Sequence, residues 1–426
     1  MLALLDISDF RRLWLGQLTS VFGTWLLVIA VPLYVFDRTG STVATGATFI
    51  AETLPALLLG PAAGMLVDRL DRRHVMIAAD VVRGLAVLCM LFAASPATLW
   101  VLYVALLVEN GAAQLFRPAR QALIPSLVGS QGRLPAANAM FAVIDGLVRF
   151  VGSILGGLLY LAVGFQWLVV LNAVSYLVSA LACRQVRHRA PAPGAPGALL
   201  PDRTASVWSG LRAGLRHVVS TPPLCRLLVI TAVFYLANGA VTALLVPYVR
   251  SDLHAGASAF GYLLAALGVG YLVGTLFARS LIDRFSAGGA AVVAVPALTV
   301  CYLLAFQPTD YAVTLIGFAA AGAPAVLLLV AVQTAYQQRT PDVLLGRVAA
   351  AFLTVEMAVS VTGAAAGSLL ASRTGVLPAI DVALLVLAAL GLALSRPPYR
   401  VLVGAVRARP RPVRVASSTS SARAGR

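Results

Sequence analysis

The stretch "GMLVDRLDRR", residues 64–73, carries five charges in its last six residues and lies between two apolar runs of about twenty residues. An apolar run of about 20 residues is long enough to cross a bilayer as a helix. The stretch is therefore predicted to be a short charged connector between two membrane-spanning helices. The same alternation of apolar run and polar connector recurs along the chain and predicts the class of fold.

The composition places the chain in a membrane. Of its 426 residues 60% are hydrophobic and 11% are charged, whereas roughly a quarter of the residues of a soluble protein are charged. The four cysteines are scattered without a C-x-x-C pair, so we expect neither a disulfide framework nor a metal site. No phosphate-binding loop and no nucleophile with a base at suitable spacing is present, which argues against an enzyme. The chain start does not resemble a cleaved signal peptide.

Twelve segments are apolar enough to be spanning helices. The alternating pattern of a membrane β-barrel is missing, so the prediction is an all-α membrane protein. The predicted spans are 13–36, 42–65, 75–95, 98–116, 139–161, 166–183, 224–249, 258–280, 288–306, 311–332, 349–371 and 377–395. One long Pro/Gly/Arg-rich connector divides them six and six. The predicted parts are an N-terminal bundle (1–183), a cytoplasmic linker (184–223), a C-terminal bundle (224–398) and a basic disordered cytoplasmic tail (399–426).

The arginines indicate the orientation. Cytoplasmic loops of membrane proteins are enriched in Lys and Arg. With both termini inside, the outer loops keep only Arg38, Arg250 and Arg373, and the inner loops, the linker and the tail hold most of the others. The net charge of +16 is thus explained by topology, and nucleic-acid binding is not expected. We expect a multi-pass protein of the cytoplasmic (inner) membrane, with both termini in the cytosol.

The two halves repeat each other at one offset. Asp68-Arg69 after the second span corresponds to Asp283-Arg284 after the eighth, 215 residues later. Pro125 and Arg133 after the fourth span correspond to Pro341 and Arg347 after the tenth, at offsets of 216 and 214 residues. Duplicated six-helix halves related by an axis along the membrane normal are a transporter plan, with the substrate site between the halves near the midplane.

These residues carry a specific resemblance. Gly64-x-x-x-Asp68-Arg69-x-x-Arg72-Arg73 resembles the signature loop of the major facilitator superfamily. The segments "DFRRLWLGQLTSVFGTWL", "LFRPARQALIPSLV" and "LNAVSYLVSALA" are similar to the drug:proton antiporter branch that includes macrolide-efflux-like exporters. Ser153 replaces the proline of a span-five motif found in many antiporters, and Thr24 stands where many relatives have an acid. The remaining glycines of that motif are expected to pack helices: Gly152, Gly156 and Gly157.

The resemblance implies a role for the signature loop. It is expected to hold the two halves together on the cytoplasmic side in the outward-facing state. Gly64 would allow close helix approach, and Asp68 would face the positive end of a helix from the other half. Arg69, Arg72 and Arg73 would meet carboxylates or headgroups. The alternative is that the arginines only fix the topology.

Charged and polar residues inside spans are costly and are functional candidates by default. As proton carriers we rank Glu109 first, because it lies mid-span on a helix that lines the cavity in this superfamily and has no basic residue three or four positions away. Glu52, Asp145 and Glu356 follow. Asp145 and Arg149, four residues apart, are predicted to form an ion pair, and Asp80 and Arg83 could pair in the same way or with the signature loop. The polar candidates of the cavity are completed by Asn110 and Asn238.

The leading function is proton-coupled export of hydrophobic or amphipathic small molecules by alternating access. Aromatic residues would suit such a substrate or would only pack helices: Trp25, Tyr34, Phe116, Phe234, Tyr235 and Tyr248. The alternatives are an exporter of a single siderophore or self-made metabolite, a uniporter or importer, and a membrane sensor or scaffold that transports nothing. We expect no cofactor besides a proton gradient. The expected partners are lipids and a small-molecule substrate, and the expected functional unit is a monomer.

Overall fold

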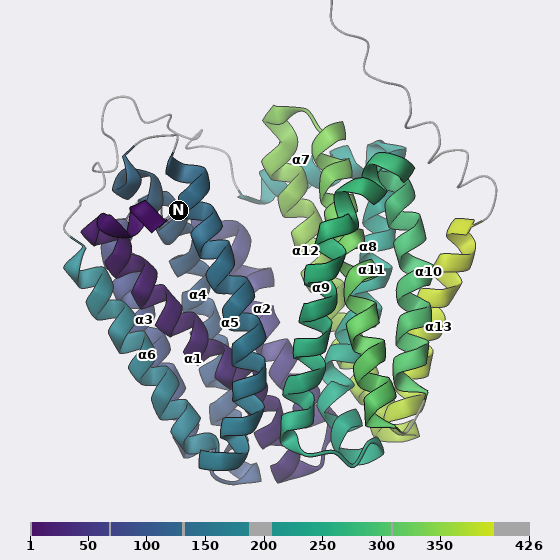
Figure 1. Ribbon diagram of the computed structural model, residues 1–426, viewed down its shortest axis with the longest axis horizontal. Coiled ribbons are helices and arrows are strands. Elements are labelled where there is room, and N and C mark those ends of the chain that lie inside the picture. Colours follow the sequence, from purple (N-terminus) through teal and green to yellow (C-terminus); the bar gives the residue numbers. More distant parts are fainter. Residues whose placement is uncertain (1, 68–69, 130–132, 187–206, 308–309, 396–426) are drawn as a thin grey trace, which may run out of the picture.

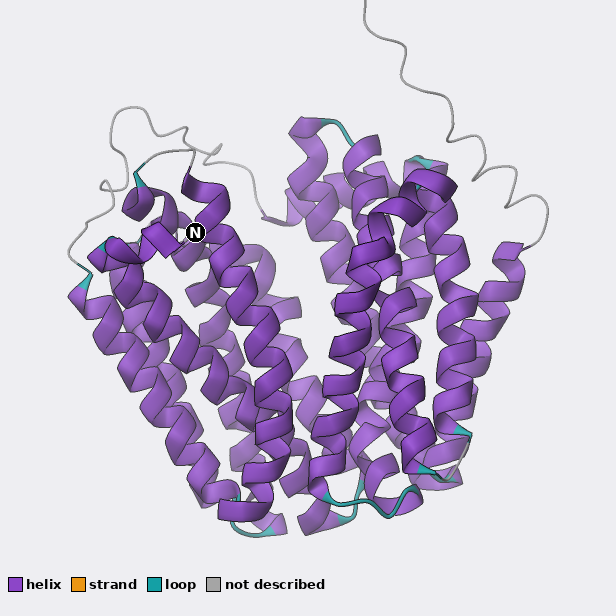
Figure 2. Ribbon diagram, in the orientation of Figure 1, coloured by secondary structure: helices purple, strands orange, loops and turns teal. Residues whose placement is uncertain are grey.

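The computed structural model describes residues 2–67, 70–129, 133–186, 207–307 and 310–395. All regular elements in these ranges are helical (Figure 2). Twelve of the described helices are long and apolar enough to cross a membrane, so the chain is a multi-pass membrane protein. Residues 187–206 of the predicted linker and the whole predicted tail (399–426) lie outside the described ranges, as do Asp68 and Arg69.

All twelve predicted spans are found, and most helices extend beyond them. The spanning helices are α1 (Ser8–Thr39), α2 (Thr42–Val67), α3 (Arg72–Cys89), α4 (Leu99–Val128), α5 (Leu134–Val163), α6 (Phe165–Gln185), α8 (Pro222–Pro247), α9 (Ala257–Phe285), α10 (Ala287–Phe306), α11 (Tyr311–Arg339), α12 (Asp342–Thr374) and α13 (Val376–Ser395). Short helical pieces cover Leu2–Asp6, Met90–Phe92, Pro96–Thr98 and Tyr248–Asp252. Helices satisfy their own backbone hydrogen bonds, which lipid cannot do for them.

The connectors are short where the sequence places turn residues. Gly40 ends α1 in a left-handed conformation with a φ of 60°, and its N–H donates to Phe36 O. This φ favours glycine because glycine has no Cβ.

One long helix was not predicted from the sequence. It is α7 (Val207–Ser220), which falls within the predicted linker and packs against α12.

The same helix neighbours occur in both halves. In the first half α1 packs on α5 and α6, α2 packs on α4, and α3 packs on α4 and α6. In the second half α8 packs on α12 and α13, α9 packs on α11, and α10 packs on α11 and α13. The main contacts between the halves are α2 with α12 and α5 with α9. These two contacts are equivalent, because α2 of the first half corresponds to α9 of the second, and α5 corresponds to α12. The fold thus consists of two pseudo-symmetric six-helix bundles, as predicted.

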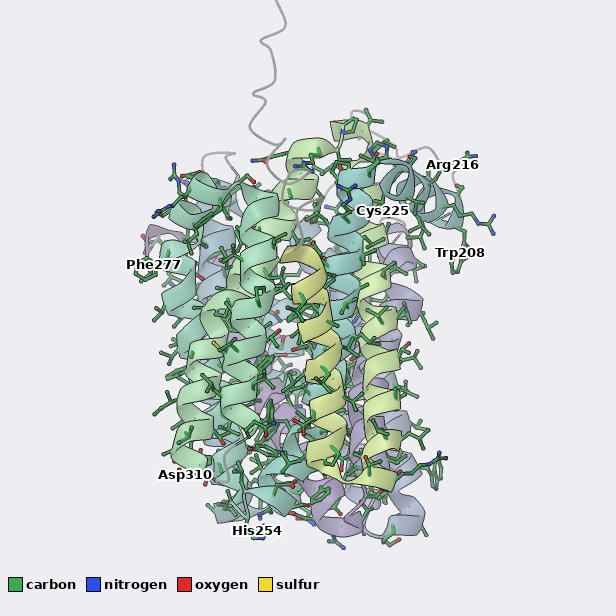
Figure 3. The ribbon with its side chains drawn as sticks, turned by 90° about the vertical axis from the view of Figure 1, so that its right-hand side faces the viewer. Trp208, Arg216, Cys225, His254, Phe277 and Asp310 are labelled. Atoms are coloured by element: carbon green, nitrogen blue, oxygen red, sulfur yellow. The ribbon has the colours of Figure 1, made fainter. Side chains whose placement is uncertain are left out.

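The bundles meet at one end of the molecule and their ribbons diverge towards the other (Figure 1). We call the end where the bundles meet the Asp37 end; α1 ends and α2 begins there. We call the end where the bundles diverge the Asp71 end; α2 ends and α3 begins there. His254 and Asp310 lie at the Asp37 end, and Trp208 and Arg216 of α7 lie at the Asp71 end (Figure 3).

Two polar contacts join the bundles at the Asp37 end. Arg250 Nη2 of the C-terminal bundle lies 2.7 Å from Asp37 Oδ2, which also accepts from Tyr160 Oη of its own bundle at 3.0 Å. Thr42 Oγ1 donates to Ser368 O of α12 at 3.1 Å. In contrast, no other described helix has an atom within 4 Å of the position that a Cβ on Gly64 would take, near the Asp71 end of α2. The structure is therefore closed between the bundles at the Asp37 end.

Candidate functional site

The glycines of α5 lie where helices approach closely. A Cβ on Gly152 would lie 2.8 Å from Trp25 Cβ, and a Cβ on Gly156 would lie 2.9 Å from Ile29 Cβ, both on α1. Gly157 faces the other bundle, and its Cβ would lie 2.9 Å from Ser258 Cα of α9. Small residues permit such close helix contacts in membranes. Ser153, in place of the motif proline, donates its hydroxyl to Arg149 O at 2.6 Å within an uninterrupted helix.

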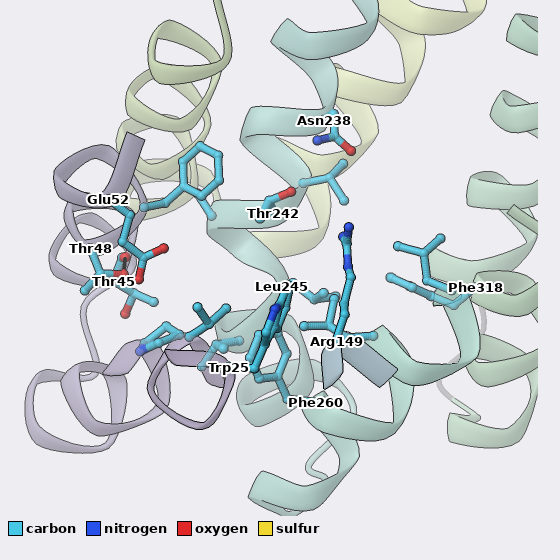
Figure 4. Close-up of a pocket in the computed structure, with 18 of the residues that line it drawn as sticks. Trp25, Thr45, Thr48, Glu52, Arg149, Asn238, Thr242, Leu245, Phe260 and Phe318 are labelled. Atoms are coloured by element: carbon cyan, nitrogen blue, oxygen red, sulfur yellow. Dashed lines mark hydrogen bonds between the residues drawn. The ribbon is translucent and has the colours of Figure 1, made fainter. Parts of the chain in front are cut away.

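A cavity of about 220 Å³ lies between the two bundles, and we call it the inter-bundle cavity. Its walls come from both halves and are mostly apolar, with a carboxylate, a guanidinium and a few hydroxyl and amide groups. The residues in contact with it include Trp25, Thr45, Thr48, Phe49, Glu52, Arg149, Asn238, Thr242, Phe260, Tyr271 and Phe318. In Figure 4 Glu52 projects from one side and Arg149 from the other, with Trp25 and Leu245 between them.

Glu52 and Arg149 are the two charged residues among those that line this cavity in the described structure. The half-buried carboxylate of Glu52 makes no hydrogen bond or ion pair with another described residue. The guanidinium of Arg149 lies over aromatic rings, with its Cζ 5.1 Å from the centroid of Trp25 and 5.9 Å from that of Tyr271. Cation–π contacts of this kind hold a guanidinium without a carboxylate partner.

The predicted Asp145–Arg149 ion pair is wrong. The structure describes both side chains and has no ion pair between them within 4.0 Å. Residues four apart on a helix can reach each other, but Arg149 points into the inter-bundle cavity and over Trp25 of α1 instead. Asp145 is exposed and does not line this cavity.

A second polar site is buried within the N-terminal bundle, and we call it the Arg83 cluster. Arg83 of α3 donates to Tyr176 Oη of α6 at 2.7 Å, and Tyr176 Oη donates to Glu109 Oε1 of α4 at 2.5 Å. Arg83 also lies 3.5 Å from Asp80 Oδ1 and 3.8 Å from Glu109 Oε1. Thr24 of α1 completes the cluster, with its Oγ1 2.8 Å from Tyr176 Oη.

Glu109 has a cation nearby in this cluster. No basic residue lies three or four positions from it in its own helix, but Arg83 supplies the cation from a different helix. Glu109 is only 6% exposed and does not line the inter-bundle cavity. The predicted Asp80–Arg83 contact is present, and it extends to Glu109 rather than to the signature loop.

The described part of the signature loop contacts its own bundle. Asp71 caps α3 by accepting from the N–H groups of Arg73 and His74 at 2.9 and 3.1 Å. Partial burial raises the pKa of the Asp71 carboxyl, but the N–H groups of His74 and Arg73 and the His74 imidazole outweigh this and hold the pKa below its usual value. Arg72 donates to Ala122 O of α4 at 2.9 Å, and Arg73 donates to Cys183 O and Arg184 O at the end of α6.

The other sequence candidates lie apart from the inter-bundle cavity, except for Asn238. Asn110 donates to Leu106 O of its own helix at 3.1 Å. In the second half, Asp283 lies 3.8 Å from Arg279 on the exposed surface of α9, and Arg284 lies over Phe285. Pro341 precedes α12, and Arg347 contacts α7 through its backbone at Gly214. Glu356 lines a separate cavity whose wall comes from the C-terminal bundle alone.

The aromatic candidates are divided among different environments. Trp25 lines the inter-bundle cavity, and Phe234 and Tyr235 line the cavity at Glu356. The ring of Tyr34 stacks on Phe165 with centroids 4.0 Å apart, and Phe116 and Tyr248 are also buried. Tyr271 and Tyr176 were missed, because an aromatic residue in an apolar helix gives no sequence signal that separates a site from packing.

The family of this chain is shown by a match between its sequence and a family model, and the fold agrees with it. The model of a family described as "Transmembrane secretion effector" matches residues 1–408. The chain belongs to this family of the major facilitator superfamily.

The relatives agree with this assignment. The chain is 27% identical to an uncharacterized MFS-type transporter, YfiS, of Bacillus subtilis (strain 168), over 85% of this chain and 86% of that protein. It is 30% identical to the multidrug efflux pump Tap of Mycolicibacterium fortuitum, over 61% of this chain and 64% of that protein. It is 25% identical to macrolide efflux protein A of Streptococcus pyogenes, over 42% of this chain and 44% of that protein.

Solved structures have the same fold at low sequence identity. A bacterial homologue of the iron transporter ferroportin in an inward-facing state superimposes with a TM-score of 0.70 at 17% identity, covering 91% of this chain and 99% of that chain. A bacterial homologue of the human lysosomal transporter Spinster, inward-facing and unoccupied, also gives a TM-score of 0.70, at 13% identity, covering 95% of this chain and 98% of that chain. Family and fold indicate a membrane transporter and not an enzyme.

Proposed function

We propose that this transporter exports hydrophobic or amphipathic small molecules in exchange for protons, by alternating access. The observation that carries the proposal is the inter-bundle cavity, which has apolar and aromatic walls from both halves and one carboxylate without a partner among the described residues. Pockets for small molecules are mostly apolar with a few placed polar groups. The printed names of Tap and macrolide efflux protein A, which describe efflux proteins, support the direction of transport.

The arginine distribution assigns the Asp71 end to the cytosol in this proposal. The protein would lie in the cytoplasmic membrane as a monomer, with both termini in the cytosol. The contacts at the Asp37 end then belong to an inward-facing state, because Asp37, Arg250 and Thr42 join the bundles on the outer side. Export would require these contacts to break while the Asp71 end closes, and the signature loop with Gly64 would stabilise that closed end.

Glu52 is the acid that best fits proton coupling in this geometry. A coupling carboxylate must meet the outer and the inner solution in turn, and Glu52 lines the cavity between the two moving halves. Glu109 ranked first from the sequence, but it is hydrogen-bonded to Tyr176 and close to Arg83 within one bundle. We therefore place Glu52 ahead of Glu109. Glu109 and Asp145 remain as further candidates, and Glu356 has a separate role below.

The experiment that tests the function uses the purified protein in proteoliposomes. A macrolide such as erythromycin and several other amphipathic drugs are offered, with and without an imposed proton gradient. We expect substrate movement against its own gradient at least about tenfold faster with the proton gradient, and a protonophore should abolish the difference. Equal rates with and without the gradient would contradict proton coupling.

The same experiment separates the alternatives. An exporter with a narrow substrate, such as a siderophore or a self-made metabolite, would move none of these drugs but would respond to an extract that contains its substrate. A sensor or scaffold would move nothing under any condition. The cavity shared by both bundles favours a transporter, because a scaffold has no need of it.

A further inference from the structure

A second cavity is lined by α8, α11 and α12, all from the C-terminal bundle. We call it the Glu356 cavity, and its volume is about 330 Å³. Four aromatic residues contribute to its wall, Phe234 and Tyr235 from α8, Tyr336 from α11 and Phe352 from α12. Phe234 and Tyr235 meet edge to face with centroids 5.1 Å apart, and Tyr336 and Phe352 also lie 5.1 Å apart.

Among the described residues that line this cavity, Glu356 is the one that carries a charge. It is half-buried and makes no hydrogen bond or ion pair with another described residue. A carboxylate within a membrane-spanning helix is costly without a positive partner. Aromatic rings attract cations at their faces, so the carboxylate and the rings favour the same kind of ligand. They disfavour an anion.

The Glu356 cavity and the inter-bundle cavity are lined by the same face of α8. Thr231 and Tyr235 line the first, and Asn238 and Thr242 line the second. Their spacings of four, three and four residues place all of them on the same helix face. Because α8 begins at the Asp71 end, near Cys225 (Figure 3), the Glu356 cavity lies on the Asp71 side of the inter-bundle cavity.

We propose that the Glu356 cavity binds an organic cation, such as a protonated amine or a quaternary onium group, before it enters the inter-bundle cavity. Glu356 supplies the opposite charge, and the rings of Tyr235 and Tyr336 supply cation–π contacts. The proposal rests on the proposed export function and names its substrate class.

The test is a binding measurement on the full chain purified in detergent, with radiolabelled tetraphenylphosphonium and equilibrium dialysis. Tetraphenylborate has the same shape with the opposite charge. It is measured in a separate dialysis, because the two ions precipitate together, and it should bind much more weakly than the phosphonium ion. Glu356→Gln keeps the side-chain size and removes the charge, so we expect the Kd to rise at least about tenfold. Asp381→Asn is the matched control, because Asp381 of α13 accepts from Gln307 at 2.8 Å outside this cavity, and it should keep the wild-type Kd.

Three results would overturn the proposal. These are a wild-type protein that does not bind the cation, a Glu356→Gln variant within about twofold of the wild-type Kd, and binding of tetraphenylborate alone that is as tight as binding of the cation. If Glu356→Gln is not monodisperse, Tyr336→Leu replaces it, with an expected loss of about threefold to tenfold from one cation–π contact. An unchanged Kd in that variant would equally overturn the site.

The result also separates this proposal from the proposed function. Binding in detergent needs neither a membrane nor a proton gradient. A wild-type protein that exports drugs but binds the phosphonium ion independently of Glu356 would contradict the cation site alone. A wild-type protein that binds the cation through Glu356 and moves no substrate in proteoliposomes would contradict the proposed function alone.

Discussion

Replacing Arg83 with leucine is expected to lower the free energy of unfolding by about 3–5 kcal/mol, because removal of one partner leaves a buried charge without compensation. In this protein two carboxylates depend on the same guanidinium, since Arg83 lies 3.5 Å from Asp80 and 3.8 Å from Glu109. Asp80 is 0% exposed and Glu109 is 6% exposed, so water cannot replace the lost partner. The effect would be measured as a lower melting temperature and a lower monodisperse yield in detergent.

A second substitution should recover part of the stability that Arg83→Leu loses. Glu109→Gln removes one of the two uncompensated charges and keeps a group that can accept from Tyr176. The double variant is therefore expected to be more stable than Arg83→Leu alone. Arg279→Leu is the control, because its ion pair with Asp283 is exposed and contributes little. A melting temperature of Arg83→Leu equal to that of Arg279→Leu would show that the Arg83 cluster does not stabilise the bundle.

Replacing Glu52 with glutamine is expected to slow gradient-driven export more than about tenfold while substrate binding persists. Glutamine keeps the size of the side chain but cannot carry a proton. The carboxylate lies in the inter-bundle cavity with no ion pair that its loss would leave unbalanced, so the variant should remain stable. The measurement is drug transport in proteoliposomes with and without an imposed proton gradient.

Glu109→Gln is the comparison variant for this experiment. Because Glu109 belongs to the Arg83 cluster and not to the cavity wall, its substitution should change stability more than coupling. The opposite pattern, with coupling lost in Glu109→Gln and kept in Glu52→Gln, would restore the ranking that the sequence alone suggested and would place the proton pathway inside one bundle.

The sequence was sufficient for the twelve spans because lipid imposes one requirement on every helix, a long apolar run. The repeat was also visible, because Asp68-Arg69 and Asp283-Arg284 mark matching connectors. α7 was missed, because its apolar residues occupy only part of a short, arginine-bearing helix that follows a Pro/Gly-rich stretch.

The candidate site was harder to predict because its contacts join different helices. Local spacing predicted an ion pair for Asp145 and Arg149, yet Arg149 lies over Trp25 of α1 and Tyr271 of α9. Local spacing also left Glu109 without a cation, although Arg83 reaches it from α3. Both errors have the same cause, since spacing along one helix says nothing about which face meets which neighbour.

We propose that the two bundles separate at the Asp37 end during each transport cycle. Asp37 and Arg250 join the bundles there through a 2.7 Å ion pair that is partly exposed, so cysteines at both positions should be tolerated. In a background without the native cysteines, a short bis-methanethiosulfonate reagent would link Asp37→Cys to Arg250→Cys, and each single-cysteine variant treated alike is the control. We expect proteoliposome transport to stop in the cross-linked protein and to return after reduction. Full transport by protein shown to be cross-linked would contradict alternating access at this end.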